Sequence, residues 1–121
     1  MKITTGTDII EIERIKNSIE KFGDTFLNTI FTEKEIEFCE SHKNQKYQHY
    51  AVRFAAKEAV FKALSFYHKE CRWKEYEILN QVDGKPIVNL ASAVPGLESI
   101  DISLSHCKEY AVANVVVLVL E

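Results

Sequence analysis

The sequence predicts an α+β domain in which a small antiparallel sheet packs against a central buried helix. Residues 53–64 contain no Gly or Pro and carry apolar side chains nearly all round, which is typical of a buried helix. Alternating or β-branched stretches near both ends of the chain indicate strands. The 121 residues are enough for one domain, residues 1–121, with its own core.

The chain is expected to begin with a strand over residues 1–10, in which Asp8 is unusual because Asp is depleted from strands. One explanation is that Asp8 caps the helix that follows, from about residue 11 to residue 22. Gly23 stands where a C-cap glycine belongs. The side chains expected to be buried on this helix are Ile12, Ile15, Ile19 and Phe22.

Two shorter helices and a loop are expected next. Asp24 is positioned to cap a short helical segment that ends near Phe31. Residues 32–35 (TEKE) match a capping box, so a helix is expected from residue 33 to about residue 41. A polar loop over residues 41–48 leads to the central helix, expected from about residue 49 to residue 65.

The second half is expected to be mainly strands. Residues 66–73 have no clear period, and His68 and Cys71 lack further ligands at zinc spacing. Strands over 76–80 and 86–90 form a hairpin around Asp83-Gly84. A connection over 91–99, with room for one helical turn, leads to a half-buried strand over 100–104. The β-branched run 112–120 is expected to be a strand covered on both faces.

Composition argues against several classes of protein. The formal net charge is −3 and there is no basic run, which disfavours nucleic-acid binding. The apolar run 110–120 is too short to span a bilayer, and the strand-like start is unlike a signal peptide. Three cysteines without a CxxC pair do not suggest a disulfide framework. We therefore expect a cytoplasmic protein that binds neither membrane nor nucleic acid.

Two carboxylates stand in unfavourable places, Asp8 on a strand and Glu58 on a buried helix. A pair of this kind suits magnesium, which is typically held by one or two carboxylates together with water and substrate phosphates. Arg53 and Lys62 would supply cations for those phosphates. The alternative for Glu58 is an ordinary ion pair with Lys62, four residues later, which leaves Asp8 unexplained.

Four groups of residues carry a family resemblance. In chain order they are Gly6-Thr7-Asp8-Ile9, the run RFAAKEA at 53–59 with Lys62-Ala63, Gly84-Lys85-Pro86, and Ser103-Leu104-Ser105-His106 with Tyr110-Ala111-Val112-Ala113. In order, spacing and chain length they resemble the holo-acyl-carrier-protein synthase family, the small bacterial type of 4'-phosphopantetheinyl transferase. The resemblance covers nearly the whole chain.

The resemblance implies a 4'-phosphopantetheinyl transferase-like fold and a magnesium-dependent transfer of 4'-phosphopantetheine from coenzyme A to a serine of apo-acyl carrier protein. By the family pattern, Asp8 and Glu58 hold the metal and Lys62 lies beside the pyrophosphate. Arg53 and the pair Ser105-His106 belong to the coenzyme A pocket. The family forms homotrimers with shared active sites, and the first helix, carrying Arg14 and Lys21, lies where the acidic carrier docks.

The chain also departs from the family pattern. Thr7 replaces an Ile or Val, and Asp24 stands where a basic carrier-binding residue is expected. The glycine-containing loop expected after Leu64 is replaced by residues 65–68 (SFYH), whose Cβ atoms hinder close approach to phosphate. The second hypothesis is therefore a non-catalytic trimeric module that binds coenzyme A or the carrier. A purely structural domain is the third.

Overall fold

Two antiparallel sheets and one long helix form the centre of the computed structural model, which describes residues 1–120. Glu121, the last residue of the expected domain, lies outside the described residues. The elements follow in the order β1 (Lys2–Glu11), α1 (Ile12–Phe22), α2 (Asp24–Ile30), α3 (Glu33–Ser41), α4 (Lys46–Ala63), β2 (Tyr76–Asn80), β3 (Pro86–Leu90), β4 (Leu97–His106) and β5 (Tyr110–Val119), with 3-10 turns at Lys43–Gln45 and Trp73–Glu75. The predicted α+β class is confirmed.

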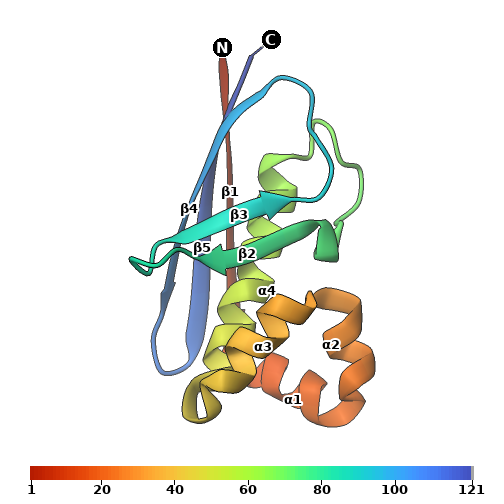
Figure 1. Cartoon of the computed structure of the whole chain (residues 1–121), viewed down its shortest axis with the longest axis vertical. Helices are drawn as coiled ribbons and strands as arrows, with labels where there is room; N and C mark the ends of the chain where they lie inside the picture. Colours follow the sequence, from red (N-terminus) through yellow and green to blue (C-terminus); the bar gives the residue numbers. More distant parts are fainter. Residues whose placement is uncertain (121) are drawn as a thin grey trace.

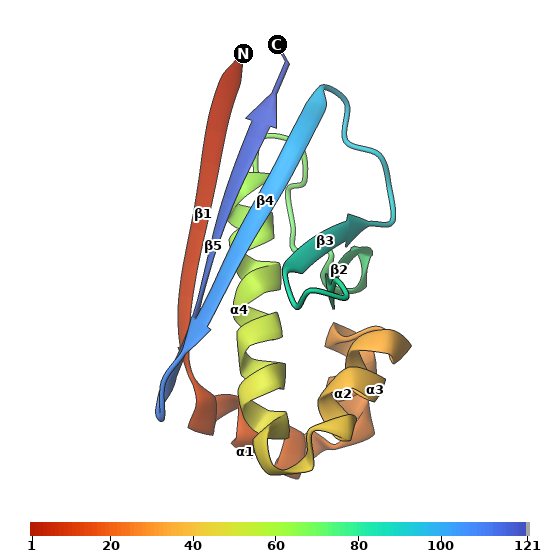
Figure 2. The ribbon, with the colours of Figure 1, turned by 60° about the vertical axis from the view of Figure 1, so that its left-hand side comes forward.

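The larger sheet has the strand order β1-β5-β4, so the C-terminal strand lies between the N-terminal strand and β4. The two chain ends therefore lie at the same end of the molecule (Figure 1). Figure 2 shows α4 running along this sheet, while α1, α2 and α3 gather around the first turns of α4. The β2–β3 hairpin forms the second, two-stranded sheet. The predicted hairpin has the predicted bounds and Gly84 in its turn, at φ 90°.

Strand β1 lies against α4 because Gly6 has no side chain. A Cβ atom on Gly6 would lie 1.9 Å from the carbonyl oxygen of Ala59, which is far inside van der Waals contact. The Thr4 hydroxyl also donates a hydrogen bond to the Ala63 carbonyl, at 2.7 Å. Asp8 is on the same face of β1 as Thr4 and Gly6, so this close approach brings its carboxylate beside the helix.

Helix α4 carries the core, as the sequence predicts, but its bounds differ from the expected residues 49–65. It begins at Lys46, because the 3-10 turn Lys43–Gln45 leads directly into it, and it ends at Ala63. Small side chains on α4 allow the sheet and the neighbouring helices to pack closely around it. The fully buried members of this set are Ala51, Ala55, Ala56, Ala59 and Ala63.

The predicted capping box is present and also holds a buried charge. Glu35 Oε1 accepts a hydrogen bond from the Thr32 amide at 2.8 Å and lies 2.7 Å from Lys57 Nζ. Its other oxygen accepts from the Ile78 amide, at 2.8 Å. Lys57 also donates to the carbonyls of Trp73 and Tyr76, both at 2.8 Å. This fully buried ion pair joins α3, α4 and the start of β2.

Several local predictions are wrong. Phe22 is 55% exposed, because α1 ends there and Gly23, at φ 55°, redirects the chain into α2. Asp24 is the first residue of α2 and makes no capping hydrogen bond, since Gly23 holds the N-cap position. No helical turn forms over residues 91–99 within the described chain; β4 begins at Leu97 and reaches His106.

The expectation that the last strand is covered on both faces is wrong for a single copy of the chain. Burial alternates along β5, and Val116 is 49% exposed. On the same face, the neighbouring strand β1 carries Ile3 and Ile9, which are 66% and 64% exposed. One copy therefore leaves apolar side chains exposed on the outer face of the sheet. Among residues 1–120, no helix has the length and apolar character needed to cross a membrane.

Candidate active site

Asp8, Glu58 and Lys62 line one pocket of about 370 Å³ between β1, α1 and α4, which we call the carboxylate cleft. Strand β1 contributes Asp8, and α4 contributes the other two from positions one turn apart. Apolar side chains, one hydroxyl and one further cation complete the lining. These are Ile9, Ile10, Ile15, Phe26 and Phe54, with Ser18 and Arg14.

Lys62 pairs with Asp8. Its ammonium lies 3.1 Å from Asp8 Oδ1 and donates a second hydrogen bond to the Thr7 carbonyl at 2.9 Å. Among residues 1–120, no Glu58–Lys62 ion pair forms, so the ordinary i,i+4 alternative is wrong. The capping alternative for Asp8 is also wrong, because the N-cap residue of α1 is Glu11, three positions further on.

Glu58 is half-buried and shares the cleft with a like charge. Burial raises the pKa of Glu58, and the neighbouring Asp8 carboxylate raises it further, while Lys62 lowers it. A cation placed between the two carboxylates would relieve this repulsion. No group of three His, Cys, Asp or Glu side chains suited to a metal occurs among residues 1–120. Two neighbouring carboxylates are the kind of ligand set that suits magnesium, which takes most of its remaining ligands from water and phosphate.

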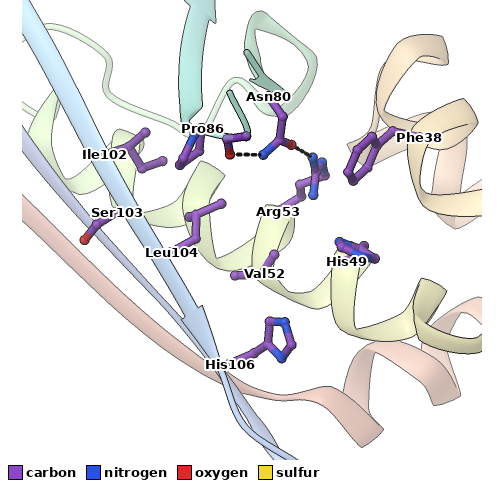
Figure 3. A pocket seen from close by; sticks show the side chains of 11 residues that line it. Phe38, His49, Val52, Arg53, Asn80, Pro86, Ile102, Ser103, Leu104 and His106 are labelled. Carbon is purple, nitrogen blue, oxygen red and sulfur yellow. Dashed lines mark hydrogen bonds between the residues drawn. The ribbon is translucent and has the colours of Figure 1, made fainter. Parts of the chain in front are cut away.

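A second pocket, of about 330 Å³, lies around Arg53, and we call it the Arg53 pocket (Figure 3). The guanidinium of Arg53 lies over the Phe38 ring, 4.2 Å from its centroid. Arg53 donates a hydrogen bond to Asn80 Oδ1, and Asn80 Nδ2 donates to the Gly84 carbonyl at 2.9 Å. The hairpin thus fixes a buried cation at the pocket wall.

Arg53 keeps one donor unused. Arg53 is only 2% exposed, and its buried Nε lacks a hydrogen-bond partner within residues 1–120. Burial also lowers the pKa of Arg53, with Cys39 and Glu35 acting against that shift. The Arg53 guanidinium is a buried cation with a free N–H donor and one face against an apolar ring. Such a group is well suited to bind a ligand that carries phosphate.

The expected pair Ser105-His106 is divided between the two faces of the sheet. His106, at the end of β4, lines the Arg53 pocket, together with His49 from α4. Ser105 pairs with Val112 of β5 and points to the outer face, because successive strand residues alternate. The strand predicted over residues 100–104 is thus too short, because β4 reaches His106 and includes both residues.

The two pockets are not one site within a single copy of the chain. Arg53 and Glu58 are five residues apart on α4, which places them roughly 140° apart around the helix axis. The lining residues of the Arg53 pocket and of the carboxylate cleft do not overlap. The predicted site residues Asp8, Glu58 and Lys62 therefore come together, whereas Arg53 and His106 gather elsewhere.

The remaining predicted residues lie on α1. Arg14 is exposed and lines the carboxylate cleft. Lys21, near the end of the helix, is exposed and lies over the ring of Phe22, 5.3 Å from its centroid. The loop after Leu64 needs no glycine to form: the amides of Tyr67 and His68 both donate to the Leu64 carbonyl, at 2.9 Å. No residue other than glycine in the described chain has a positive φ.

The comparison with protein families gives a match over residues 4–115 to the 4'-phosphopantetheinyl transferase superfamily. The chain belongs to this superfamily. It is 48% identical to a holo-[acyl-carrier-protein] synthase of Ruminiclostridium cellulolyticum, over 97% of this chain and 92% of that protein. It is 50% identical to the enzyme of that name from Dehalococcoides mccartyi, over 93% and 95%. The family resemblance drawn from the sequence is confirmed.

Solved structures of the superfamily have the same fold. A holo-(acyl-carrier-protein) synthase from Bacillus anthracis in complex with CoA (3',5'-ADP) superposes with a TM-score of 0.79 at 36% identity, covering 94% of each chain. A Helicobacter pylori holo-[acyl-carrier-protein] synthase in complex with coenzyme A gives 0.82 at 30% identity, covering 94% of this chain and 99% of that one. The 4'-phosphopantetheinyl transferase-like fold is therefore confirmed.

Proposed function

We propose that this chain transfers the 4'-phosphopantetheine group of coenzyme A to a serine of apo-acyl carrier protein and releases adenosine 3',5'-bisphosphate. The serine oxygen forms a bond to the phosphorus that carries pantetheine. The pyrophosphate P–O bond breaks, and the serine proton is released. The observation that carries the proposal is the carboxylate cleft, because this family member holds Asp8, Glu58 and Lys62 together at one opening.

In this proposal Asp8 and Glu58 hold a magnesium ion. The bound ion would neutralise pyrophosphate charge and align the phosphates for in-line transfer. Lys62, already 3.1 Å from Asp8, sits where its ammonium can also reach a phosphate oxygen. Little covalent chemistry is required from the protein, because positioning and charge stabilisation supply most of the rate enhancement in phosphoryl transfer.

The Arg53 pocket is proposed to bind another part of coenzyme A. Arg53 offers a buried guanidinium with an unused donor, and His106 lines the same pocket. Ser105 is on the outer sheet face, so it would reach coenzyme A only from an interface between copies of the chain. The proposed transfer therefore uses the carboxylate cleft of one copy and the Arg53 pocket of its neighbour.

A homotrimer with shared active sites fits this division of the site. The open outer face of the large sheet carries exposed apolar side chains on β1 and β5, and burial of such side chains is a common basis of stable assembly. Its apolar members are Ile3, Ile9, Val112, Val116 and Leu118. Light scattering at micromolar concentration should give the mass of three chains. A fully active monomer would contradict this part of the proposal.

The carrier is proposed to dock on α1 beside the carboxylate cleft. The whole chain has a net charge of −3, so an acidic carrier must recognise a local group of cations. Arg14 lines the cleft itself, and Lys21 lies two turns further along the same helix. We also propose a cytoplasmic setting, in which the free cysteines Cys39, Cys71 and Cys107 stay reduced.

The test is to incubate the chain with coenzyme A, magnesium and an apo-acyl carrier protein, and then to weigh the carrier. A mass gain equal to one phosphopantetheine group is expected. Binding of coenzyme A and carrier without any mass gain would favour the alternative, a non-catalytic trimeric module of the same fold. A matched reaction with chelator in place of magnesium should leave the carrier unmodified.

A further inference from the structure

Three imidazoles lie in a row at the mouth of the Arg53 pocket. The ring centroids of His42 and His49 are 4.6 Å apart, and those of His49 and His106 are 6.5 Å apart. His49 and His106 line the pocket, and Figure 3 shows both rings at its lower end, with Arg53 above them. His49 therefore stands between two other rings of its own kind and beside a buried guanidinium.

His42, the outer ring of the row, is held by a hydrogen bond to the backbone, whereas His49, the middle ring, is half-buried at the pocket wall. His42 Nδ1 donates to the Phe38 carbonyl at 2.8 Å, so this imidazole ends α3 and lies outside the pocket lining. His49 packs edge-on against the Phe38 ring, with centroids 5.2 Å apart. That contact holds the His49 ring at the wall of the pocket.

The surroundings of His49 disfavour its charged form when the pocket holds no anion. Burial lowers the pKa of His49 to about 4, with further lowering by Arg53, His42 and His106. These groups act on it from α4 itself, from the end of α3 and from the end of β4. The hairpin side of the pocket adds Asn80, Gly84 and Pro86, which carry no charge. At neutral pH the ring is therefore neutral.

We propose that His49 is a further coenzyme A-binding residue, which takes up a proton when a phosphate group enters the Arg53 pocket. This inference rests on the proposed function. A bound phosphate places negative charge among Arg53, His49 and His106, and so acts against the burial and the repulsion that together keep His49 neutral. The imidazolium can then donate a charge-assisted hydrogen bond to the phosphate, which a neutral ring does less strongly.

The sign of the effect follows from linkage. Because binding raises the pKa of His49 above its value in the free protein, affinity should rise as pH falls toward the range in which the bound ring is charged. Uptake of one full proton would strengthen binding by about tenfold for each unit of decreasing pH. The gain ends once the ring is charged in the free protein as well.

The experiment is calorimetric titration of the chain with coenzyme A and magnesium at pH 6, in buffers of different ionisation enthalpy, which gives the protons bound per ligand. The 3'-phosphate of coenzyme A also titrates near pH 6, so the result is compared with His49→Phe, which keeps an aromatic ring beside Phe38. His42→Phe, which alters a ring outside the pocket lining, is the matched control.

On binding coenzyme A, wild type and His42→Phe should each bind as much as one proton more than His49→Phe does. Their affinity for coenzyme A should also rise, relative to that of His49→Phe, as pH falls. Equal proton uptake in wild type and His49→Phe would overturn the role of His49 alone. If wild type does not bind coenzyme A at any pH, the proposed function fails together with this inference. A second readout needs no variant: the His49 ring signals in nuclear magnetic resonance should titrate at higher pH with coenzyme A than without it, and an unchanged midpoint would overturn the proposal.

Discussion

The Lys62 ammonium lies 3.1 Å from Asp8 Oδ1, across the interface between α4 and β1. Glu58, one helical turn before Lys62, therefore lies in the same cleft as Asp8, while Lys62 forms its ion pair with Asp8. An ion held by Asp8 and Glu58 would compete with the ammonium for Asp8. Lys62 would then be released toward the phosphates of a bound substrate.

Glu58→Gln should remove transfer activity without lowering stability. Burial and Asp8 raise the pKa of Glu58, so its folded-state pKa exceeds its unfolded value and the ionised group costs stability at neutral pH. Replacing it with a neutral amide removes that cost. We expect a melting temperature no lower than that of wild type in metal-free buffer at pH 7, measured by calorimetry.

The effect of magnesium on the melting temperature should distinguish Glu58→Gln from wild type. A ligand that binds only the folded state raises the melting temperature, so magnesium should stabilise wild type and leave Glu58→Gln unchanged. The transfer rate of the variant should fall by more than the roughly 10–100-fold that loss of an outer-shell partner costs. Near-normal turnover at saturating magnesium would contradict the metal assignment.

Gly6→Ala should separate β1 from α4. The added Cβ would lie 1.9 Å from the Ala59 carbonyl oxygen, so backbone must move. Overpacking of this kind costs about 1–3 kcal/mol of unfolding free energy, which denaturant titration would measure. Transfer should fall as well, because Asp8 would move away from Glu58. Thr25→Ala, at an exposed site on α2 away from the outer sheet face, should change neither quantity.

Lys57→Ala should be far more destabilising than Glu58→Ala, although the two residues are adjacent. Lys57 is fully buried and pairs with Glu35 at 2.7 Å, so its removal leaves an unpaired buried carboxylate. Loss of one partner of a buried pair costs about 3–5 kcal/mol. Chemical denaturation of the two variants gives the comparison. Equal stabilities would show that the buried pair does not hold α3, α4 and β2 together.

Arg14→Glu should weaken binding of the acyl carrier protein and leave binding of coenzyme A unchanged. Charge reversal places like charges opposite each other, which costs more than the loss of a rim contact. We expect a several-fold higher KM for the carrier at low salt and an almost unchanged KM for coenzyme A. Lys34→Glu, the same charge change at an exposed site on α3, is the control. If both variants behave like wild type, α1 is only a solvated face.

The sequence predicted the parts of the site that are set by local pattern. Asp8 stands out because its carboxylate breaks a strand pattern, and Glu58 because it is ionisable on a buried helix. Both signals can be read in a few neighbouring residues. The capping box was equally local, and the structure has it where it was expected.

The missed features depend on contacts between distant segments. Glu35 is the last residue of the capping box, and nothing in its neighbouring residues indicates that it also pairs with Lys57. The wall of the Arg53 pocket is built by Asn80 and Phe38, which reach Arg53 only through the fold of the hairpin and of α3. Ser105 lies on a strand because β4 extends two residues beyond its predicted end, and the face that such a residue takes depends on its position along the strand.

We propose that the carboxylate cleft of one copy and the Arg53 pocket of its neighbour form one active site. Mixing two variants that should each be inactive, Glu58→Gln and Arg53→Met, and letting their subunits exchange would show whether the two pockets act together. Arg53→Met keeps an apolar stem against Phe38, and its fold is checked by calorimetry. Random exchange pairs an intact cleft with an intact pocket at about one interface in four, so the mixture should recover about a quarter of wild-type transfer. A mixture no more active than the separate variants, with exchange confirmed by mass spectrometry of the intact assemblies, would contradict the shared site.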